Sequence, residues 1–539
     1  MKVLKRSKEA EGFDISKVKK VAKWACTGLP VDPLVLESKI SFIFKDGVST
    51  SDIHKNMIYH AKLLVSVEDP EWSIVAGRLL MMKMWKDRGH IKGYRPYAPY
   101  VMSMVSTGKY SPSIVHYYSP DELHEASSWI VEDRDLLYDF AGANLLNHRY
   151  LIEGELPQEM YLTIALLLAS PEKPKDRMRY ARVFYEALST LEVSLATPIL
   201  SNLRKPNGNL SSCFIATMDD DLDSIFDVVH GVARISKNGG GVGVNLSKVR
   251  ALGAMIKDVL NASGGVVPWA KILNDTAIAV NQLGKRAGAV TVGLDTWHLD
   301  IEMFLELQLE NGDQRFRAYD VFPQVIVSDL FMEAVDANKT WHLFDPHEVK
   351  EILGYDLAEL HNEEFREAYA ECVLSEKLLL TKEISARGLF KEIMKTQIES
   401  GMPYIFFKDL ANRTNPNSHQ GYIPQGNLCM ESFSNVKADA EVHTCNLVSL
   451  NLATLAKTGN LNEACLTSVR ILDNTIELTT TPLKESNTHN DMYRTIGVGA
   501  MGLADYLAHM KVPYEKAIEV ADDLFESICY MTITALHFL

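Results

Sequence analysis

The sequence has no Cys-x-x-Cys pair, and its seven cysteines are an odd number spread over 539 residues. Secreted disulfide scaffolds and zinc ribbons carry closely spaced or paired cysteines, so this usage argues against both classes. The N-terminus lacks an apolar signal segment, and the longest apolar stretch, around 164–169, is too short to cross a bilayer. We therefore expect a cytoplasmic protein that does not bind membranes.

Positive charge is also scarce, because 55 Lys and Arg residues stand against 70 Asp and Glu residues, which gives a net charge of −15. Binding to nucleic acid needs a basic face, which this balance disfavours. No P-loop pattern occurs, and the glycine-rich segment 239–243 lacks the last glycine of a dinucleotide fingerprint. We expect that segment to form a tight turn before a strand. A chain of this length with 47% hydrophobic residues can bury a large core in more than one domain.

An amide, a thiol and a carboxylate occupy alternate positions at Asn427, Cys429 and Glu431. In extended backbone their side chains would point the same way and form a small reactive cluster. Two further thiols could serve it, Cys213 in a Ser-Ser-Cys segment and Cys445 shortly after the cluster. No basic residue adjoins Cys429, whereas thiolate nucleophiles need a neighbour that lowers their pKa. One thiol to react and two to be oxidised is a recognisable chemical arrangement.

The other four cysteines show no such pattern. An isolated cysteine in an intracellular chain is usually a small buried hydrophobe without chemistry. We expect this of Cys26, Cys372, Cys465 and Cys529. Each cysteine of the reactive set would be interpreted the same way if it stood alone. Their order and spacing, together with the flanking Asn and Glu, distinguish them.

From about Lys5 to its last residue, the ordered set of motifs resembles the large, catalytic subunit of class I ribonucleotide reductase, which acts on nucleoside diphosphates. The resemblance implies that Cys429 is a transient thiyl radical that removes the C3′ hydrogen of the ribose. It implies that Glu431 takes the 3′-hydroxyl proton and that Asn427 holds the sugar. Cys213 and Cys445 would supply the electrons that replace the 2′-hydroxyl by hydrogen, and would end as a disulfide.

The resemblance extends to substrate and effector contacts. Thr197 and Ser212 match residues that contact the substrate. The basic N-terminal segment resembles the ATP-cone, which binds ATP as activator and, in many members, dATP as inhibitor; its matching residues are Lys5, Arg6, Glu11, Lys17, Thr50 and His54. The residues that match the specificity site for dNTP effectors are Asp220, Arg250, Gln282 and Arg286.

Each effector site has a plainer interpretation from the residues alone. The N-terminal charges could be a solvated basic face, although the stretch from Thr50 to His54 offers a helix N-cap that phosphates favour. The segment 282–288 could be a surface loop without function. Asp14 stands where asparagine is common in the family, and Asp87 follows Lys86, near which the family has a basic residue. Inhibition by dATP is therefore an open question.

Short β-rich runs alternate with helical patterns from 211 onward, after a helical stretch that ends in a turn at 196–200. This alternation predicts an α/β fold in which crossover helices connect parallel strands. The resemblance implies a ten-stranded α/β barrel with the reactive cysteine on a central loop. We expect an ATP-cone at 1–93, a helical domain at 94–208, and a barrel at 209–539 that is incomplete at its C-terminus.

The incomplete barrel leads us to expect partners. The family's large chain normally continues beyond this point, with a loop that grips the substrate diphosphate, tyrosines that pass the radical, and a reducing cysteine pair. We expect a split gene of phage type, with a separate C-terminal fragment of the large subunit; a truncated sequence or a non-functional remnant is the alternative. The resemblance also implies a homodimer, a small subunit whose di-iron or dimanganese centre supplies the radical, and thioredoxin or glutaredoxin as reductant.

Two other functions compete with the catalytic one. The chain could be a nucleotide sensor without catalysis, although a sensor has no use for the reactive cysteines. It could also be a cobalamin-dependent (class II) reductase, which shares the three thiols. No metal is expected in the chain itself: His298, Asp300 and Glu302 are interpreted as part of an ordinary surface helix rather than a metal site.

Overall fold

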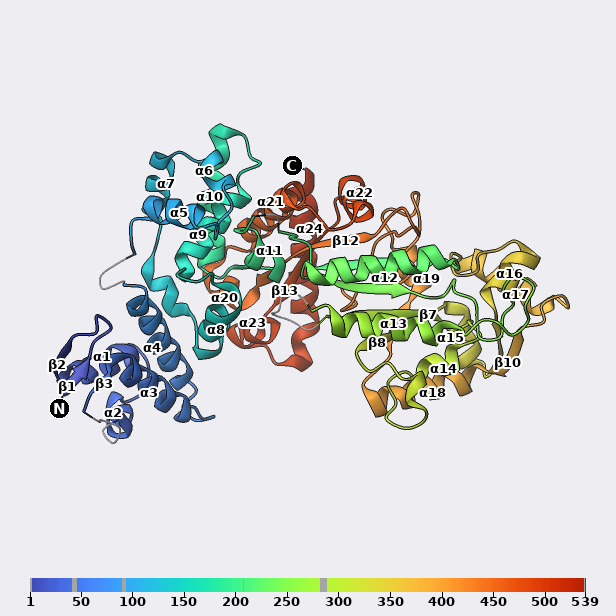
Figure 1. Ribbon diagram of the computed structural model, residues 1–539, viewed down its shortest axis with the longest axis horizontal. Coiled ribbons are helices and arrows are strands. Elements are labelled where there is room, and N and C mark those ends of the chain that lie inside the picture. The colour runs from blue at the N-terminus through green and yellow to red at the C-terminus, as the bar shows by residue number, and fades with distance from the viewer. Residues whose placement is uncertain (1, 41–45, 90–93, 207, 282–287, 538) are drawn as a thin grey trace. The chain divides into compact units, whose positions relative to one another are not determined.

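The computed structural model describes residues 2–40, 46–89, 94–206, 208–281, 288–537 and 539 (Figure 1). The chain divides into two compact units. Unit 1 comprises residues 1–207, 449–474 and 500–539, and unit 2 comprises residues 208–448 and 475–499. The chain therefore leaves unit 1 at residue 207 and returns to it twice.

Unit 1 begins with a small α/β subdomain. Strand β1 (Lys2–Leu4) pairs with β2 (Ala10–Gly12) in antiparallel and with β3 (Val48–Ser49) in parallel orientation. Helices α1 (Ile15–Cys26) and α2 (Pro33–Ile40) lie between β2 and β3, and helices α3 (Thr50–Leu63) and α4 (Trp72–Asp87) follow β3. The expected N-cap near Thr50 is one residue earlier, because the Ser49 hydroxyl accepts a hydrogen bond from the Asp52 backbone N–H at 3.0 Å.

The rest of unit 1 is mostly helical, as the apolar periodicity predicted. Its first helices are α5 (Tyr97–Ser106), α6 (Ser113–Tyr117), α7 (Pro120–Ser127), α8 (Phe140–Leu145), α9 (Pro157–Leu168), α10 (Pro174–Ser189) and α11 (Thr197–Asn202). Helix α9 is buried along its whole length, which explains its continuous apolar sequence. The turn expected at 196–200 is wrong: Thr197 and Pro198 begin α11, where proline is favoured because the first turn needs no N–H donor.

The last helices of unit 1 come from the two later segments. They include α20 (Leu452–Thr458), α23 (Leu503–Met510) and α24 (Ala517–His537), while α21 (Leu461–Leu478) begins in unit 1. Helix α24 buries Leu524 and Ile528 but leaves Ile518, Tyr530 and Ile533 mostly exposed. Cys529 is exposed on the same helix, so the expectation that it is a buried hydrophobe is wrong, whereas Cys26, Cys372 and Cys465 are buried as expected.

One buried carboxylate connects the subdomain at the N-terminus to the helical part of unit 1. Asp135 is fully buried and accepts hydrogen bonds from the Trp85 indole at 2.8 Å, the Tyr94 hydroxyl at 2.5 Å and the Gln158 amide at 3.0 Å. Burial raises the pKa of Asp135 to about 6, although these three hydrogen bonds oppose the rise.

This raised pKa predicts a pH effect on stability. The folded state binds a proton at Asp135 that the unfolded state has already released between pH 4 and 6, so the Asp135 contribution to stability is lost as pH rises through this window. A shift of this size corresponds to about 3 kcal/mol. Thermal unfolding of the wild type and of Asp135→Asn at pH 4.5, 5.5 and 7 should show a smaller stabilisation of the variant on acidification. Equal pH profiles would contradict the prediction.

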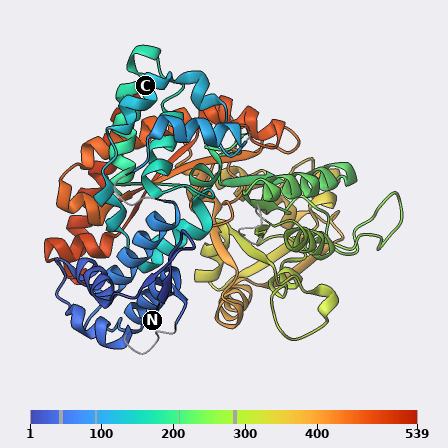
Figure 2. The same cartoon turned by 60° about the vertical axis from the view of Figure 1, so that its left-hand side comes forward.

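Unit 2 is built on one large sheet, whose parallel strands lie among the green to orange helices in Figures 1 and 2. The strands follow one another in the order β11-β8-β7-β6-β5-β12-β13. The first five are parallel to their neighbours: β11 (Tyr404–Phe407), β8 (Val321–Val327), β7 (Val290–Asp295), β6 (Gly241–Asn245) and β5 (Cys213–Thr217). Strand β12 (His443–Asn451) is antiparallel to β5, and β13 (Ile496–Met501) follows it at the edge. Helices α12 (Leu222–Lys237) and α13 (Val266–Ala279) connect successive parallel strands. The predicted α/β fold is confirmed.

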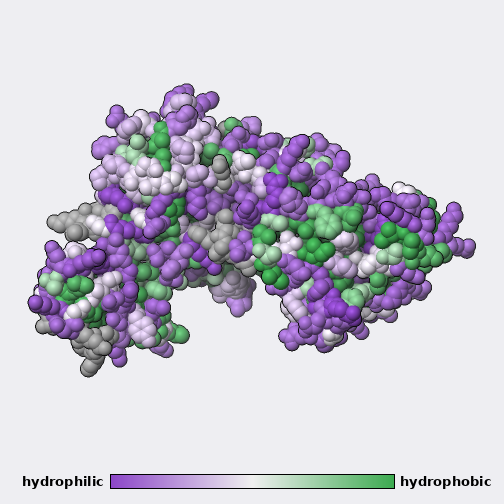
Figure 3. Space-filling view, in the orientation of Figure 1, coloured by the Kyte–Doolittle hydropathy of each residue, from purple (hydrophilic) through white to green (hydrophobic). Residues whose placement is uncertain are grey.

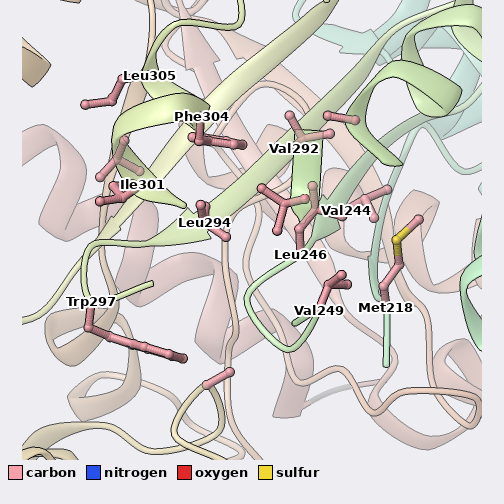
Figure 4. Packing of buried hydrophobic residues seen from close by; sticks show 14 of the residues in the cluster. Met218, Val244, Leu246, Val249, Val292, Leu294, Trp297, Ile301, Phe304 and Leu305 are labelled. Atoms are coloured by element: carbon pink, nitrogen blue, oxygen red, sulfur yellow. The ribbon is translucent and has the colours of Figure 1, made fainter. Parts of the chain in front are cut away.

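Valine-rich strands and apolar helix faces form the core of this unit. Val244, Leu246, Val292 and Leu294 lie on the central strands and their ends, and Phe304 packs with them from α14 (Ile301–Leu305) (Figure 4). Strands of a parallel sheet are buried on both faces, which explains why these runs are continuously apolar. Before β6, Gly239 adopts φ +90°, a left-handed conformation that favours glycine, as the expected tight turn requires.

A two-stranded sheet and further helices complete unit 2. Strand β9 (Thr340–Phe344) pairs in antiparallel orientation with β10 (Thr381–Ser385). The helices are α15 (Asp329–Asp336), α16 (Pro346–Leu353), α17 (Asn362–Leu374), α18 (Ala386–Ser400), α19 (Lys408–Arg413) and α22 (Lys484–Tyr493). Among the described residues, no helix is long and apolar enough to cross a membrane.

Candidate active site

A loop from about 424 to 436 runs across one face of the unit 2 sheet. It crosses β7, where the Thr291 hydroxyl donates to the Leu428 carbonyl at 2.9 Å, and β8, where the Gln324 side chain accepts from the Gly426 N–H at 3.1 Å. Glycines on the strands make this close approach possible. A Cβ at Gly243 would lie 2.6 Å from the Gly426 carbonyl oxygen, and one at Gly293 would lie 1.9 Å from Gln425 Oε1.

The sequence analysis missed these supporting residues. The alternation of glycine and valine in β6 was interpreted only as a turn followed by a strand. Glycine inside a strand marks a position where other backbone comes close, so Gly243 and Gly293 were the available signal. Nothing in the sequence alone indicated which segment would fill the space.

The backbone around Cys429 is a turn, so the extended conformation predicted for 427–431 is wrong. Met430 has φ +67°, in the left-handed region. Asn427 is fully buried, and its side-chain oxygen accepts hydrogen bonds from the backbone N–H groups of Glu431 at 3.0 Å and Ser432 at 3.1 Å. The Asn427 side chain thereby closes the turn. Its amide nitrogen is buried and has no hydrogen-bond partner among the described residues, which leaves a donor for a ligand.

The two outer thiols lie directly opposite each other on neighbouring strands. Cys445 on β12 is the register partner of Cys213 on β5, and both are buried. Directly opposed residues of an antiparallel pair have Cα atoms about 4.5–5.5 Å apart. A disulfide needs a Cα separation of about 4.4–6.8 Å. The backbone geometry of this pair therefore permits a disulfide.

The carboxylate of the cluster contacts one of these thiols. The Cys213 thiol donates to Glu431 Oε1 at 3.4 Å. A hydrogen bond with Cys445, burial and the negative charge of Glu431 raise the pKa of the Cys213 thiol well above its ordinary value. Cys213 is therefore protonated at neutral pH. A pair of opposed thiols beside a carboxylate suits a two-electron oxidation that forms a disulfide.

Cys429 differs from the other two thiols because it is exposed. The Tyr404 side chain on β11 is near it: burial and then the charges of Cys429 and Glu431 raise the pKa of Tyr404. Tyr404 is a polar neighbour of the cluster that the sequence analysis did not identify. Five residues expected at one site, Cys213, Asn427, Cys429, Glu431 and Cys445, thus lie on the central loop and two adjacent strands of the same unit.

The other two expected substrate contacts have different surroundings. Ser212 directly precedes β5, and its backbone N–H donates to the Cys445 carbonyl at 3.3 Å, so it belongs to the thiol cluster. Thr197 is in unit 1, where its hydroxyl is 3.0 Å from the Tyr150 hydroxyl. A role for either residue in substrate binding stays a prediction.

Two buried histidines hold the end of the loop. The His443 ring bonds to the Ser432 hydroxyl at 2.8 Å, and the His489 ring bonds to the Ser434 hydroxyl at 3.1 Å. The rings pack edge to face with centroids 5.0 Å apart. Burial lowers the pKa of both, to about 4 for His489, so both rings are neutral at pH 7. These contacts fix the backbone that follows Glu431.

Asp220 and Arg250, two of the residues expected at the specificity site, form an ion pair. The Arg250 guanidinium donates to both carboxylate oxygens of Asp220, with the shortest contact 2.7 Å from Nη2, and His347 Nδ1 lies 3.3 Å from the same carboxylate. The other two residues expected there, Gln282 and Arg286, lie outside the described residues.

The expected nucleotide contacts of the N-terminal subdomain are held by carboxylates or by burial. Glu11 pairs with Lys5 at 2.7 Å and with Lys17 at 2.9 Å, and Arg6 pairs with Asp87 at 2.6 Å. His54 is buried, and its Nε2 lies 2.8 Å from the Leu79 carbonyl oxygen. Burial first, and then the charge of Lys86, lowers the pKa of His54 to about 4. Thr50 is the first residue of α3.

The residues His298, Asp300 and Glu302 were expected on a surface helix, and this is wrong for the first two. His298 and Asp300 are buried: the imidazole bonds to the Val249 carbonyl at 2.8 Å, and the Asp300 carboxylate accepts from the Leu252 and Val266 N–H groups. Glu302 pairs with Lys382. Over the described ranges, no three His, Cys, Asp or Glu residues are grouped so that they could hold a metal ion.

Comparison with known protein families covers nearly the whole chain. Residues 1–87 match the model described as the ATP cone domain, and residues 136–208 match the all-alpha domain of ribonucleotide reductase. Residues 211–537, more than half of the chain, match the ribonucleotide reductase barrel domain, in agreement with the curled α/β sheet of unit 2. The chain belongs to the ribonucleotide reductase large-subunit family. The ATP cone match supports binding of nucleotide effectors in the N-terminal subdomain.

Curated relatives agree with this assignment. The chain is 52% identical over 534 residues to "Ribonucleoside-diphosphate reductase subunit alpha" of Synechocystis, covering 98% of this chain and 69% of the relative. Proteins of the same name are 37% identical in Treponema pallidum, with 93% and 63% covered, and 32% identical in Enterobacteria phage T4, with 99% and 72% covered. The chain thus spans about two thirds of the length of these relatives.

Proposed function

We propose that the chain is the radical-bearing part of a ribonucleoside-diphosphate reductase. The observation that carries the proposal is the convergence of three thiols, a carboxylate and an amide on one face of the unit 2 sheet, with two of the thiols in register on adjacent strands. A nucleotide sensor needs none of this arrangement. The relatives that carry the same domains are named as reductase alpha subunits.

The proposed chemistry divides among the residues as follows. The Cys429 thiyl radical takes the C3′ hydrogen of the ribose, and Glu431 accepts the proton of the 3′-hydroxyl. The 2′-hydroxyl leaves as water, and Cys213 and Cys445 supply two electrons and two protons as they form a disulfide. Cys429 then returns the hydrogen atom to C3′, and Glu431 returns the proton to the 3′ oxygen. The net change is ribonucleoside diphosphate plus two thiols to deoxyribonucleoside diphosphate, a disulfide and water.

The remaining proposals concern binding. The free amide donor of Asn427 supports a contact with the sugar, and we propose Ser212 and Thr197 as further substrate contacts. We propose that Asp220 and Arg250, together with Gln282 and Arg286, bind a dNTP effector that selects the substrate. Lys5, Arg6, Glu11, Lys17, Thr50 and His54 are the proposed contacts for ATP or dATP in the cone.

We propose four partners and a barrel of ten strands. Exposed apolar residues gather over α12 and α13, among them Leu222, Phe226 and Ile278, and suit a homodimer interface (Figure 3). A small subunit with a di-iron or dimanganese centre supplies the radical, and thioredoxin or glutaredoxin reduces the disulfide in the cytoplasm. The exposed apolar residues of α24, Ile518, Tyr530 and Ile533, favour docking of a C-terminal fragment encoded by a split gene, which completes the barrel.

Reconstitution tests this function. The chain would be combined with the small subunit and with a polypeptide that carries the remaining third of the relatives' length, and CDP reduction would be assayed with each component omitted in turn. We expect product only when all three are present, because the radical, the thiols and the rest of the barrel are all required. Turnover by the chain and small subunit alone would contradict the need for a companion. No turnover by the complete set would contradict the function.

A further inference from the structure

The end of α4 carries a carboxylate in the middle of the basic residues of the cone. Asp87 Oδ1 lies 2.6 Å from Arg6 Nε, and Asp87 Oδ2 lies 2.5 Å from Lys83 Nζ. Each oxygen of this carboxylate therefore accepts from a different cation. Arg6 lies two residues after β1, and Lys83 and Asp87 lie near the C-terminal end of α4, so the tertiary fold of the cone brings them together.

Two further basic residues lie around this ion-pair group. The charge of Arg6, together with burial as the larger cause, lowers the pKa of Lys86. The charges of Lys86, Arg6 and Lys83 also contribute to the lowered pKa of His54, after burial. Mutual repulsion of this kind requires that the basic groups are close to each other. Asp87 is the carboxylate that Arg6 and Lys83 share in this cluster.

The Arg6 guanidinium has a hydrogen-bond donor that can still bind a ligand. Its Nη2 atom is buried and has no hydrogen-bond partner within the part of the chain that the structure describes. A buried guanidinium nitrogen without an acceptor is costly, and a phosphate oxygen is an ideal acceptor because two parallel N–H groups can bind it. Arg6 can therefore donate a further hydrogen bond to an anion through Nη2, while its Nε already donates to Asp87.

We propose that the Asp87 carboxylate takes the place of a phosphate group when no nucleotide is bound. A nucleoside triphosphate then binds the cone by displacing this carboxylate from Arg6 and Lys83. This inference rests on the proposed nucleotide binding of the cone. Since both cations must exchange one anion for another, Asp87 lowers the affinity for triphosphates. It also leaves a negative charge next to the bound phosphates. Asp87, at which the sequence differs from the family pattern, therefore sets the effector concentration to which this chain responds.

Nucleotide titrations of the full chain test the proposal. ATP and dATP affinities would be measured by calorimetry for the wild type, Asp87→Asn, Asp87→Glu and a control, Glu37→Gln. Glu37 also forms an ion pair in the cone, with Lys19 at 3.7 Å, but neither residue belongs to the basic cluster. We expect Asp87→Asn to bind about fivefold tighter, a typical effect for a partly exposed ion pair. Asp87→Glu and Glu37→Gln should bind like the wild type.

A second readout separates charge competition from a structural effect. The gain of Asp87→Asn should be largest at low ionic strength and disappear near 1 M salt, where the Debye length falls to about 3 Å. Inorganic triphosphate should show the same gain, because the proposal concerns the phosphates. Equal or weaker binding by Asp87→Asn, with wild-type binding intact, would overturn the role of Asp87. Absence of binding in every variant would instead overturn nucleotide binding by the cone.

Discussion

Replacing Cys429 by serine should abolish product formation in the reconstituted enzyme while nucleotide binding persists. A hydroxyl O–H bond is much stronger than a thiol S–H bond, so serine at this position cannot pass its hydrogen atom to an incoming radical and cannot attack C3′. Cys429 is also exposed, and the Asn427 carbonyl that shapes the turn accepts from backbone N–H groups rather than from the thiol, so the substitution should not disturb the fold.

The assay is CDP reduction with all partners present, and calorimetric binding of ATP serves as the parallel readout. Cys372→Ser is the control, because Cys372 lies on α17, outside the reactive cluster. It should retain wild-type turnover. Turnover by Cys429→Ser at the level of this control would remove the thiyl radical from the proposed mechanism. Loss of ATP binding together with activity would assign Cys429 to structure.

The strands of unit 2 were predictable because local sequence and global fold agree there. The alternation of β-rich runs and helical patterns expected from 211 onward is found in the order β5, α12, β6, α13 and β7. Valine-rich runs bounded by glycine favour buried parallel strands whatever the tertiary context. The parallel orientation followed from the intervening helices.

The conformation of the reactive loop was not predictable in the same way. Alternating residue types suggested extended backbone for 427–431, but no strand within the described ranges pairs with this segment. The Asn427 side chain instead bonds to the N–H groups of Glu431 and Ser432, and asparagine often competes with regular structure in this manner. The cluster forms through a turn stabilised by tertiary contacts such as Thr291 with Leu428.

The burial or exposure of single residues could also not be predicted from the sequence. His298 looked like an exposed helical residue, yet it is buried and bonds to the Val249 carbonyl, a partner 49 residues away. Cys529 looked like a core residue in an apolar-periodic helix, but α24 exposes that face. His298 is buried through a contact with a residue far away in the sequence, whereas no segment of the described residues covers the exposed face of α24 at Cys529. Neither situation leaves a pattern in the local sequence.

Mild oxidation of the isolated chain should form one disulfide, between Cys213 and Cys445. The strand register places these residues directly opposite each other, and the pairing is fixed by the sheet rather than by a mobile segment. Seven free thiols should fall to five, since 7 − 2 = 5. Peptide mapping by mass spectrometry would identify the pair.

Either Cys213→Ser or Cys445→Ser should prevent this disulfide and abolish turnover, because a single thiol cannot supply two electrons. Cys372→Ser, a change at another buried cysteine, should do neither. The Cys213 thiol is protonated at neutral pH, so oxidation by thiol-disulfide exchange should be slow and should accelerate as pH rises. In turnover, by contrast, the substrate is the oxidant and takes up the protons of both thiols, so a protonated Cys213 is the form that reacts. A disulfide that mapped to other cysteines, or full activity of either serine variant, would contradict the assignment of these two thiols as the reductant.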